Sequence, residues 1–191
     1  MNYRHRLNQW ILAMSLLSLS TLCCALPAYS TEHKDAQIKE ASSQTELVIF
    51  LVRHGEKDTG DNPSLTAEGK QRAEQLAAML ANNQLDGIYS TDYKRTQETA
   101  GPSALKQQLE IQSYDPRHLE DFSDALKAKT GRYLVVGHSN TTTALVSLLG
   151  GEPQGDIDDS SEFNRLYILN IKHTKHGNEV TSVLLRYGAN H

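Results

Sequence analysis

The feature that most constrains the fold is a run of six apolar residues, LVIFLV, at positions 47–52. A short, continuously apolar run rich in Val and Ile is typical of a strand buried on both faces in the middle of a parallel sheet. Neighbouring parallel strands need a crossover connection, which is usually a helix. The run therefore favours an α/β fold in which helices cover both faces of the sheet.

Segments with strand and helix patterns alternate along the rest of the chain. Apolar side chains recur at helical spacing over residues 67–81, and Thr66 is a suitable cap for that helix. Asp92 can cap a second helix, which we expect Gly101 and Pro102 to interrupt. The remaining predicted helices lie at 119–129 and 141–149, and the remaining strands at 86–90, 109–114, 133–136, 165–171 and 180–187.

This order predicts the fold class α/β, as a single three-layer α/β/α domain over residues 46–191. The sheet should be mostly parallel, because a helix separates each of the first strands from the next. The last two strands are close together in the sequence and should form an antiparallel hairpin at the edge of the sheet. A chain of 191 residues has room for one such domain.

The N-terminus has the pattern of an export signal. Residues 1–9 carry positive charge and no acid, residues 10–26 are uncharged and mostly apolar, and small residues follow Pro27 at a suitable cleavage position. We therefore predict a secretory signal peptide over 1–30, a polar linker over 31–45, and a periplasmic or secreted protein with no stable membrane span after cleavage. The alternative is an uncleaved N-terminal anchor, for which the apolar run is slightly short.

Composition excludes several classes of protein. The net charge is −4, so the chain has no basic surplus with which to neutralise a nucleic-acid backbone. The two cysteines, Cys23 and Cys24, lie within the predicted signal, which rules out a disulfide scaffold and a cysteine-based metal site in the domain.

Four charged or titratable residues follow the predicted strands at positions where the strand ends should meet. Arg53 and His54 follow the first strand, Arg95 lies at the start of the helix after the second, and His138 follows the fourth. Ligands of open α/β sheets bind at the carboxyl ends of the strands. Two arginines there suit a dianion such as phosphate, and a neutral imidazole can form a covalent intermediate. Because side chains supply the positive charge, no metal and no cofactor is expected.

Three segments resemble the histidine phosphatase superfamily, which has the phosphoglycerate-mutase-like fold. They are Arg53-His54-Gly55 after the apolar strand, residues 89–100 (YSTDYKRTQETA), and residues 136–141 (VGHSNT). The order and placement of the segments also match, and the chain is similar to the short branch that includes the small bacterial phosphohistidine phosphatases. The resemblance covers residues 46–187.

The resemblance implies a role for each residue that matches the family pattern. His54 would be the nucleophile, and Arg53, Arg95 and His138 would bind the phosphoryl group. Glu120 is our choice for the general acid, and Asp115 is its rival. In addition, Lys57 is a candidate for substrate binding, although an exposed loop lysine is the more common explanation of such a residue.

We therefore expect a metal-independent phosphatase that hydrolyses a small phosphomonoester through a phosphohistidine. Mutase activity is not expected, because only about 40 residues separate His54 from Arg95 and no later insertion is long enough to exclude water. The alternative is a module of the same fold that binds phosphate or a phosphorylated ligand without turnover. The acidic run containing Asp156, Asp158, Asp159 and Glu162 reads as a solvated loop.

Overall fold

The computed structural model describes residues 46–189. The predicted signal peptide and linker lie outside the described residues. Among the described residues, no helix has both the length and the apolar character needed to cross a membrane.

The described chain forms one mixed sheet of six strands, which confirms the predicted α/β class. The strand order is β3-β2-β4-β1-β5-β6, and β1 to β4 are mutually parallel where they pair. The strands are β1 (Glu46–Arg53), β2 (Gly87–Ser90), β3 (Ile111–Ser113), β4 (Gly131–Gly137), β5 (Arg165–Thr174) and β6 (Gly177–Arg186). β5 and β6 form the expected antiparallel hairpin at one edge.

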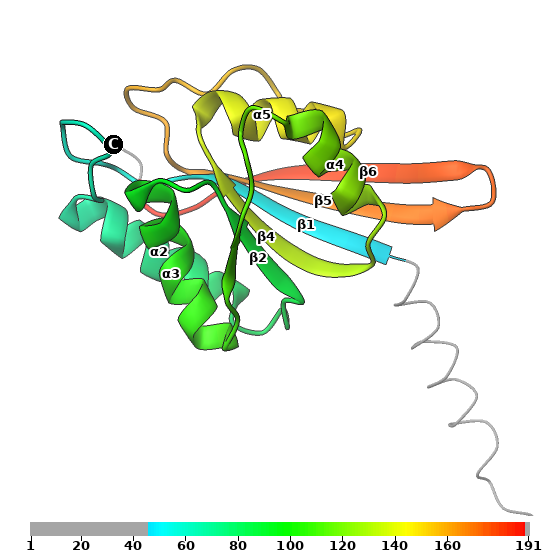
Figure 1. Ribbon diagram of the computed structural model, residues 1–191, viewed down its shortest axis with the longest axis horizontal. Coiled ribbons are helices and arrows are strands. Elements are labelled where there is room, and N and C mark those ends of the chain that lie inside the picture. The colour runs from blue at the N-terminus through cyan, green and yellow to red at the C-terminus, as the bar shows by residue number, and fades with distance from the viewer. Residues whose placement is uncertain (1–45, 190–191) are drawn as a thin grey trace, which may run out of the picture.

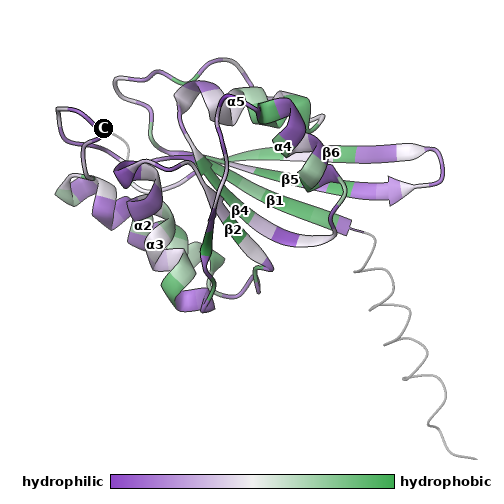
Figure 2. Cartoon of the chain, viewed as in Figure 1, coloured by the Kyte–Doolittle hydropathy of each residue, from purple (hydrophilic) through white to green (hydrophobic). Residues whose placement is uncertain are grey.

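Helices cover both faces of the sheet (Figure 1). On one face lie α2 (Ala67–Leu80) and α3 (Lys94–Gln107), and on the other lie α4 (Leu119–Lys127) and α5 (Ser139–Leu148). Side chains of β1 alternate between the faces: Leu47, Ile49 and Leu51 join the core under α4 and α5, whereas Phe50 and Val52 join the core under α2 and α3. Figure 2 shows the centre of the sheet as hydrophobic and the far end of the β5–β6 hairpin as polar.

The prediction that Gly101 and Pro102 interrupt the second helix is wrong, because α3 continues through both residues to Gln107. The proline ring removes one N–H from the helix, but side chains on either side of it, including Ala100, Ser103 and Ala104, are buried against the sheet. Asp92 is not the cap either. The N-cap is Tyr93, whose side chain makes no capping hydrogen bond.

Candidate active site

The sheet topology brings three strand ends together. β4 lies between β2 and β1, and all three are parallel, so their carboxyl ends share one edge. In the register of the pair, Arg53 at the end of β1 lies opposite Gly137 at the end of β4. The amide of His54 donates to the carbonyl of Gly137 at 3.0 Å, and the amide of Thr91 after β2 donates to the carbonyl of Val136. Backbone hydrogen bonds thus hold the residues after all three strands in one place.

Close backbone packing explains the glycine that follows His54. A Cβ on Gly55 would lie 2.9 Å from the carbonyl oxygen of Gly69, and a Cβ on Gly69 would lie 2.1 Å from the carbonyl oxygen of Glu56. The loop after β1 therefore packs directly on the first turn of α2, where a side chain would not fit. The amide of Gly55 also donates to Thr99 Oγ1 of α3 at 3.0 Å, which fixes the turn that carries His54.

His54 is buried, with 2% of its surface exposed, and its Nδ1 lies 2.7 Å from the carbonyl oxygen of Gly55. A carbonyl only accepts, so Nδ1 carries the proton and Nε2 keeps its lone pair. Burial is the main cause that lowers the pKa of His54 to about 3, and the positive charges of Arg53 and Arg95 act in the same direction. At neutral pH the ring is a neutral imidazole with a free nucleophilic nitrogen.

His138 is the N-cap residue of α5, and its ring centroid lies 5.5 Å from that of His54. Its Nδ1 lies 3.3 Å from Nη2 of Arg95, and its Nε2 lies 3.0 Å from Thr91 Oγ1. Since a guanidinium can only donate, Nδ1 accepts and Nε2 carries the proton. Burial, followed by the charge of Arg95, lowers the pKa of His138 to about 4. The two histidines are therefore neutral and have opposite tautomers.

The two arginines have hydrogen-bonding capacity that the protein leaves unused. The Nε atoms of Arg53 and Arg95 are both buried, and neither has a hydrogen-bond partner among the described residues. Burial lowers the pKa of Arg53, and the positive charge of Arg95 lowers it further. A buried donor without a partner costs about 1–3 kcal/mol. An anion that accepted from these N–H groups would recover that cost.

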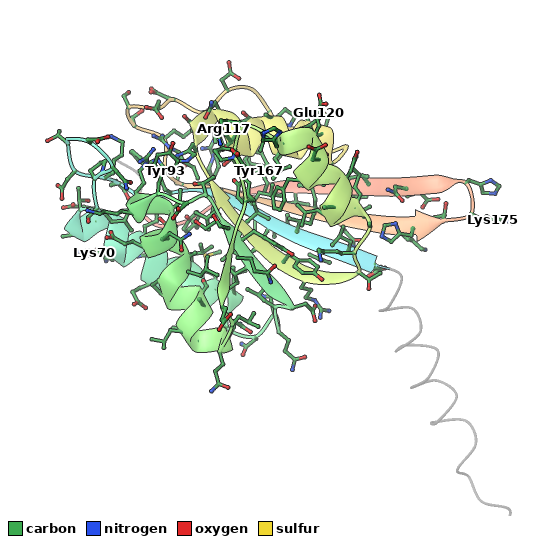
Figure 3. The ribbon with its side chains drawn as sticks, in the orientation of Figure 1. Lys70, Tyr93, Arg117, Glu120, Tyr167 and Lys175 are labelled. Atoms are coloured by element: carbon green, nitrogen blue, oxygen red, sulfur yellow. The ribbon has the colours of Figure 1, made fainter. Side chains whose placement is uncertain are left out.

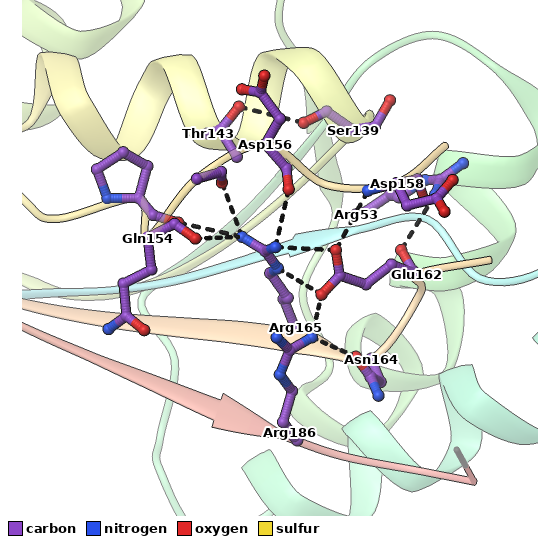
Figure 4. Close-up of polar contacts among 12 residues, drawn as sticks. Arg53, Ser139, Thr143, Gln154, Asp156, Asp158, Glu162, Asn164, Arg165 and Arg186 are labelled. Atoms are coloured by element: carbon purple, nitrogen blue, oxygen red, sulfur yellow. Dashed lines mark hydrogen bonds and ion pairs between the residues drawn. The ribbon is translucent and has the colours of Figure 1, made fainter. Parts of the chain in front are cut away.

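The acidic run is solvent-exposed at Asp156, Asp158 and Asp159, as predicted, but its backbone is docked on a buried arginine. Nη1 of Arg53 donates to the carbonyl oxygens of Asp158 and Glu162, and Nη2 donates to the carbonyl oxygen and the carboxylate of Asp159. The Glu162 carboxylate pairs with Arg165 and Arg186. Figure 4 shows Arg53 and Arg165 as the two guanidinium groups around which this loop folds. The loop thus binds buried arginines mainly through its carbonyl groups and Glu162, while the side chains of Asp156, Asp158 and Asp159 remain exposed.

The structure brings Arg53, His54, Arg95 and His138 together, whereas no contact among the described residues joins Glu120 or Asp115 to either histidine. Glu120 is exposed on the first turn of α4 and lines a cavity of 340 Å³ with Leu148 (Figure 3). The Asp115 carboxylate is held by the Arg117 guanidinium, which lowers the pKa of Asp115.

Lys57 is exposed beside the site, in an isolated bridge with Leu65. Its charge acts on the Asp159 carboxylate. Lys57 therefore lies at the surface of the site rather than in its interior.

Several side chains around the site were not predicted. Tyr93 packs edge-on against His138 and lies under the Arg95 guanidinium. Phe163 stacks on Arg53, with 4.1 Å between the guanidinium carbon and the ring centroid. Ser139 donates to the Asp159 carboxylate at 2.7 Å. Tyr93 and Ser139 are sequence neighbours of site residues, which was a usable signal, whereas Phe163 lies 110 positions from Arg53 and no local pattern connects them.

Comparison with known proteins agrees with this geometry. The model of the histidine phosphatase superfamily (branch 1) matches residues 49–117, which include Arg53, His54 and Arg95. The resemblance to the histidine phosphatase superfamily is confirmed. No curated protein sequence matches the chain.

Several solved structures share the fold. A mycobacterial glucosyl-3-phosphoglycerate phosphatase has a TM-score of 0.58 at 13% identity, with 75% of this chain and all of that chain covered (100%). A candidate SixA phosphohistidine phosphatase from Nakamurella multipartitia has a TM-score of 0.55 at 15% identity, with coverage of 75% and 98%. A mycobacterial protein named hydrolase 2 has a TM-score of 0.57 at 15% identity, with coverage of 76% and 92%. Nearly the whole of each of these proteins corresponds to the described domain.

Proposed function

We propose that this protein is a phosphatase that hydrolyses a small phosphomonoester, without a metal, through a phosphohistidine on Nε2 of His54. The observation that carries the proposal is the pair of unpartnered, buried Nε–H groups of Arg53 and Arg95 beside a neutral His54. The family match and the phosphatases among the structural neighbours support phosphatase activity.

The first step is attack of His54 on phosphorus. The lone pair of Nε2 forms an N–P bond, and the bond from phosphorus to the leaving oxygen breaks with its electron pair on that oxygen. The ring then becomes cationic, and its Nδ1–H stays on the carbonyl of Gly55, which stabilises the developing charge. The guanidinium groups of Arg53 and Arg95 stabilise the charge on the phosphoryl oxygens.

In the second step, water attacks phosphorus and the N–P bond breaks. The electron pair returns to Nε2, and inorganic phosphate leaves. His138 would stabilise the phosphoryl group by turning its Nε2–H from Thr91 to a phosphoryl oxygen. Among the described residues, no group of three or more His, Cys, Asp and Glu side chains is arranged to hold a metal. The cations that stabilise the phosphoryl group in this proposal are all side chains.

The test is hydrolysis of an aryl phosphate in excess EDTA by the wild-type protein and by His54→Asn. We expect turnover that survives the chelator and is lost in the variant, together with an acid-labile, alkali-stable phosphoryl label on the wild type. His118→Asn is the matched control, because His118 is an exposed histidine near the same edge of the sheet. Phosphate binding without turnover in either protein would favour the binding module, and turnover that survives His54→Asn would refute the nucleophile.

Glu120 and Asp115 stay proposals for the acid that protonates the leaving oxygen. An aryl leaving group needs little help from an acid, whereas an alkyl leaving group needs it. Glu120→Gln or Asp115→Asn should therefore slow hydrolysis of an alkyl phosphate much more than that of an aryl phosphate. An equal effect on both substrates would contradict a role as acid.

We also propose that the protein is exported and acts on a phosphomonoester outside the cytoplasm, such as a sugar phosphate or an envelope-glycan phosphate. The support is the signal-like pattern of residues 1–30. Cell fractionation with mass measurement of the mature N-terminus tests it. Full-length protein in the cytoplasm would contradict both the export and the substrate class.

A further inference from the structure

The Asp159 carboxylate occupies a position that suits an anion. Its Oδ1 accepts from Nη2 of Arg53 at 2.7 Å and from the hydroxyl of Ser139, on the first turn of α5, at 2.7 Å. The positive charge of Lys57 also acts on it, and His54 lies close by. Asp159 therefore lies among the end of β1, the start of α5 and the loop after β1.

The contact with Asp159 leaves part of the hydrogen-bonding capacity of Arg53 unused. One edge of a guanidinium, formed by Nε and one Nη, binds two oxygens of a phosphate at once. In this structure Nη2 of Arg53 is engaged by Asp159, and Nε is buried without a partner among the described residues. A phosphoryl group that used this edge would satisfy Nε and would compete with Asp159 Oδ1 for Nη2.

We propose that Asp159 is a built-in competitor of phosphate: its carboxylate holds the phosphoryl position on Arg53 in the free protein, leaves when substrate binds, and returns to displace the product phosphate. This inference rests on the proposed function, because it takes the pocket of Arg53 and Arg95 to be the phosphoryl site. Its consequence is weak binding of inorganic phosphate, which favours release of the product.

The exchange needs only a side-chain rotation. The loop backbone is fixed on Arg53 through the carbonyl oxygens of Asp158, Asp159 and Glu162, and these contacts do not involve the Asp159 carboxylate. The side chain of Asp159 is 74% exposed, so it can turn into solvent without disturbing packed neighbours. The carboxylate can therefore leave while the loop remains docked.

Hydrogen bonding from Ser139 lowers the pKa of Asp159, and the charge of Arg53 lowers it further. The side chain is thus ionised at neutral pH, when inorganic phosphate is also an anion. Two anions cannot share Nη2 without strong repulsion, which makes the exchange close to mutually exclusive.

The test is calorimetric titration of the full-length protein with inorganic phosphate, for the wild type, Asp159→Asn and Asp159→Ala. Without the Asp159 carboxylate, phosphate has no competitor for Nη2 of Arg53 and no neighbouring anion that repels it. Phosphate binding should therefore tighten by about fivefold or more. The Ala variant also removes the amide that could still bond to Arg53, so its effect should be at least as large. Two variants at one exposed position guard against a change that merely impairs folding.

Asp156→Asn is the control, because it removes the same charge from the same loop, and Asp156 meets Arg165 through its backbone carbonyl. It should leave the dissociation constant for phosphate nearly unchanged. Equal or weaker phosphate binding by both Asp159 variants would overturn the inference and leave the proposed function standing. Failure of every protein to bind phosphate would overturn both.

Discussion

Burial of His54 as a neutral base should make the protein lose stability in mild acid. The ring is 2% exposed, and its folded pKa is about 3, against 6.5 for an unperturbed histidine. Below about pH 6.5 the unfolded chain therefore binds a proton at His54, and the folded chain does not until about pH 3. Because the unfolded state binds more protons in this window, the free energy of unfolding falls as the pH falls.

The size of the effect follows from the width of the window. Each pH unit within it is worth up to about 1.4 kcal/mol per group. From pH 6.5 down to about pH 5, above the range in which most carboxylates titrate, His54 alone should remove about 2 kcal/mol. The side chain is nearly inaccessible, so solvent screening reduces this figure little.

The perturbation that isolates the effect is His54→Asn. The amide nitrogen of asparagine can occupy the place of Nδ1 and keep the hydrogen bond to the Gly55 carbonyl, but it does not titrate. Urea unfolding followed by circular dichroism at several pH values between about 7 and 5 gives the free energies. The variant should lose about 2 kcal/mol less than the wild type over this range, and parallel curves for the two proteins would refute the reasoning.

Two further substitutions test the framework around the site. Arg72→Met should cost about 3 kcal/mol in urea unfolding, because Arg72 is buried against the Glu56 carboxylate and the carbonyl of Tyr187. Lys70→Met on the exposed side of the same helix is its control, and an equal effect of both would refute the assignment. Gly137→Ala should lower the free energy of unfolding by about 1–3 kcal/mol, because the new methyl group would lie 2.7 Å from the hydroxyl of Tyr114. Because Gly137 directly precedes His138, the same substitution should also reduce phosphate binding. Unchanged unfolding and unchanged binding would contradict this packing argument.

Local patterns predicted the fold well where the residues of one element alone, through an apolar run or helical spacing, specified that element. The apolar run at 47–52 lies within β1, and the helical spacing at 67–81 corresponds to α2 with Thr66 as its cap. The interruption at Pro102 was predicted from the same kind of rule and was wrong. Burial of the helix face outweighed the loss of one backbone hydrogen bond.

The candidate site divides in the same way. Arg53 ends β1, His54 and His138 directly follow strand ends, and Arg95 lies in the first turn of α3, so their convergence follows from parallel pairing. The choice of Glu120 depended on its distance along the sequence from Arg95, across a loop whose conformation no sequence pattern predicts. The structure places that side chain on the exposed face of α4.

The sequence by itself determined the alternation of strands and helices and the residues that end each strand, because apolar periodicity and strand-end placement are local properties. Only the tertiary structure decided what those residues contact. The tautomer of His138 depends on Arg95 and Thr91, more than 40 positions away, and the engagement of Arg53 depends on a loop more than 100 positions away. Hydrogen bonds and charge pairs between such distant segments form only when the sheet has assembled, and no local pattern in the chain specifies them.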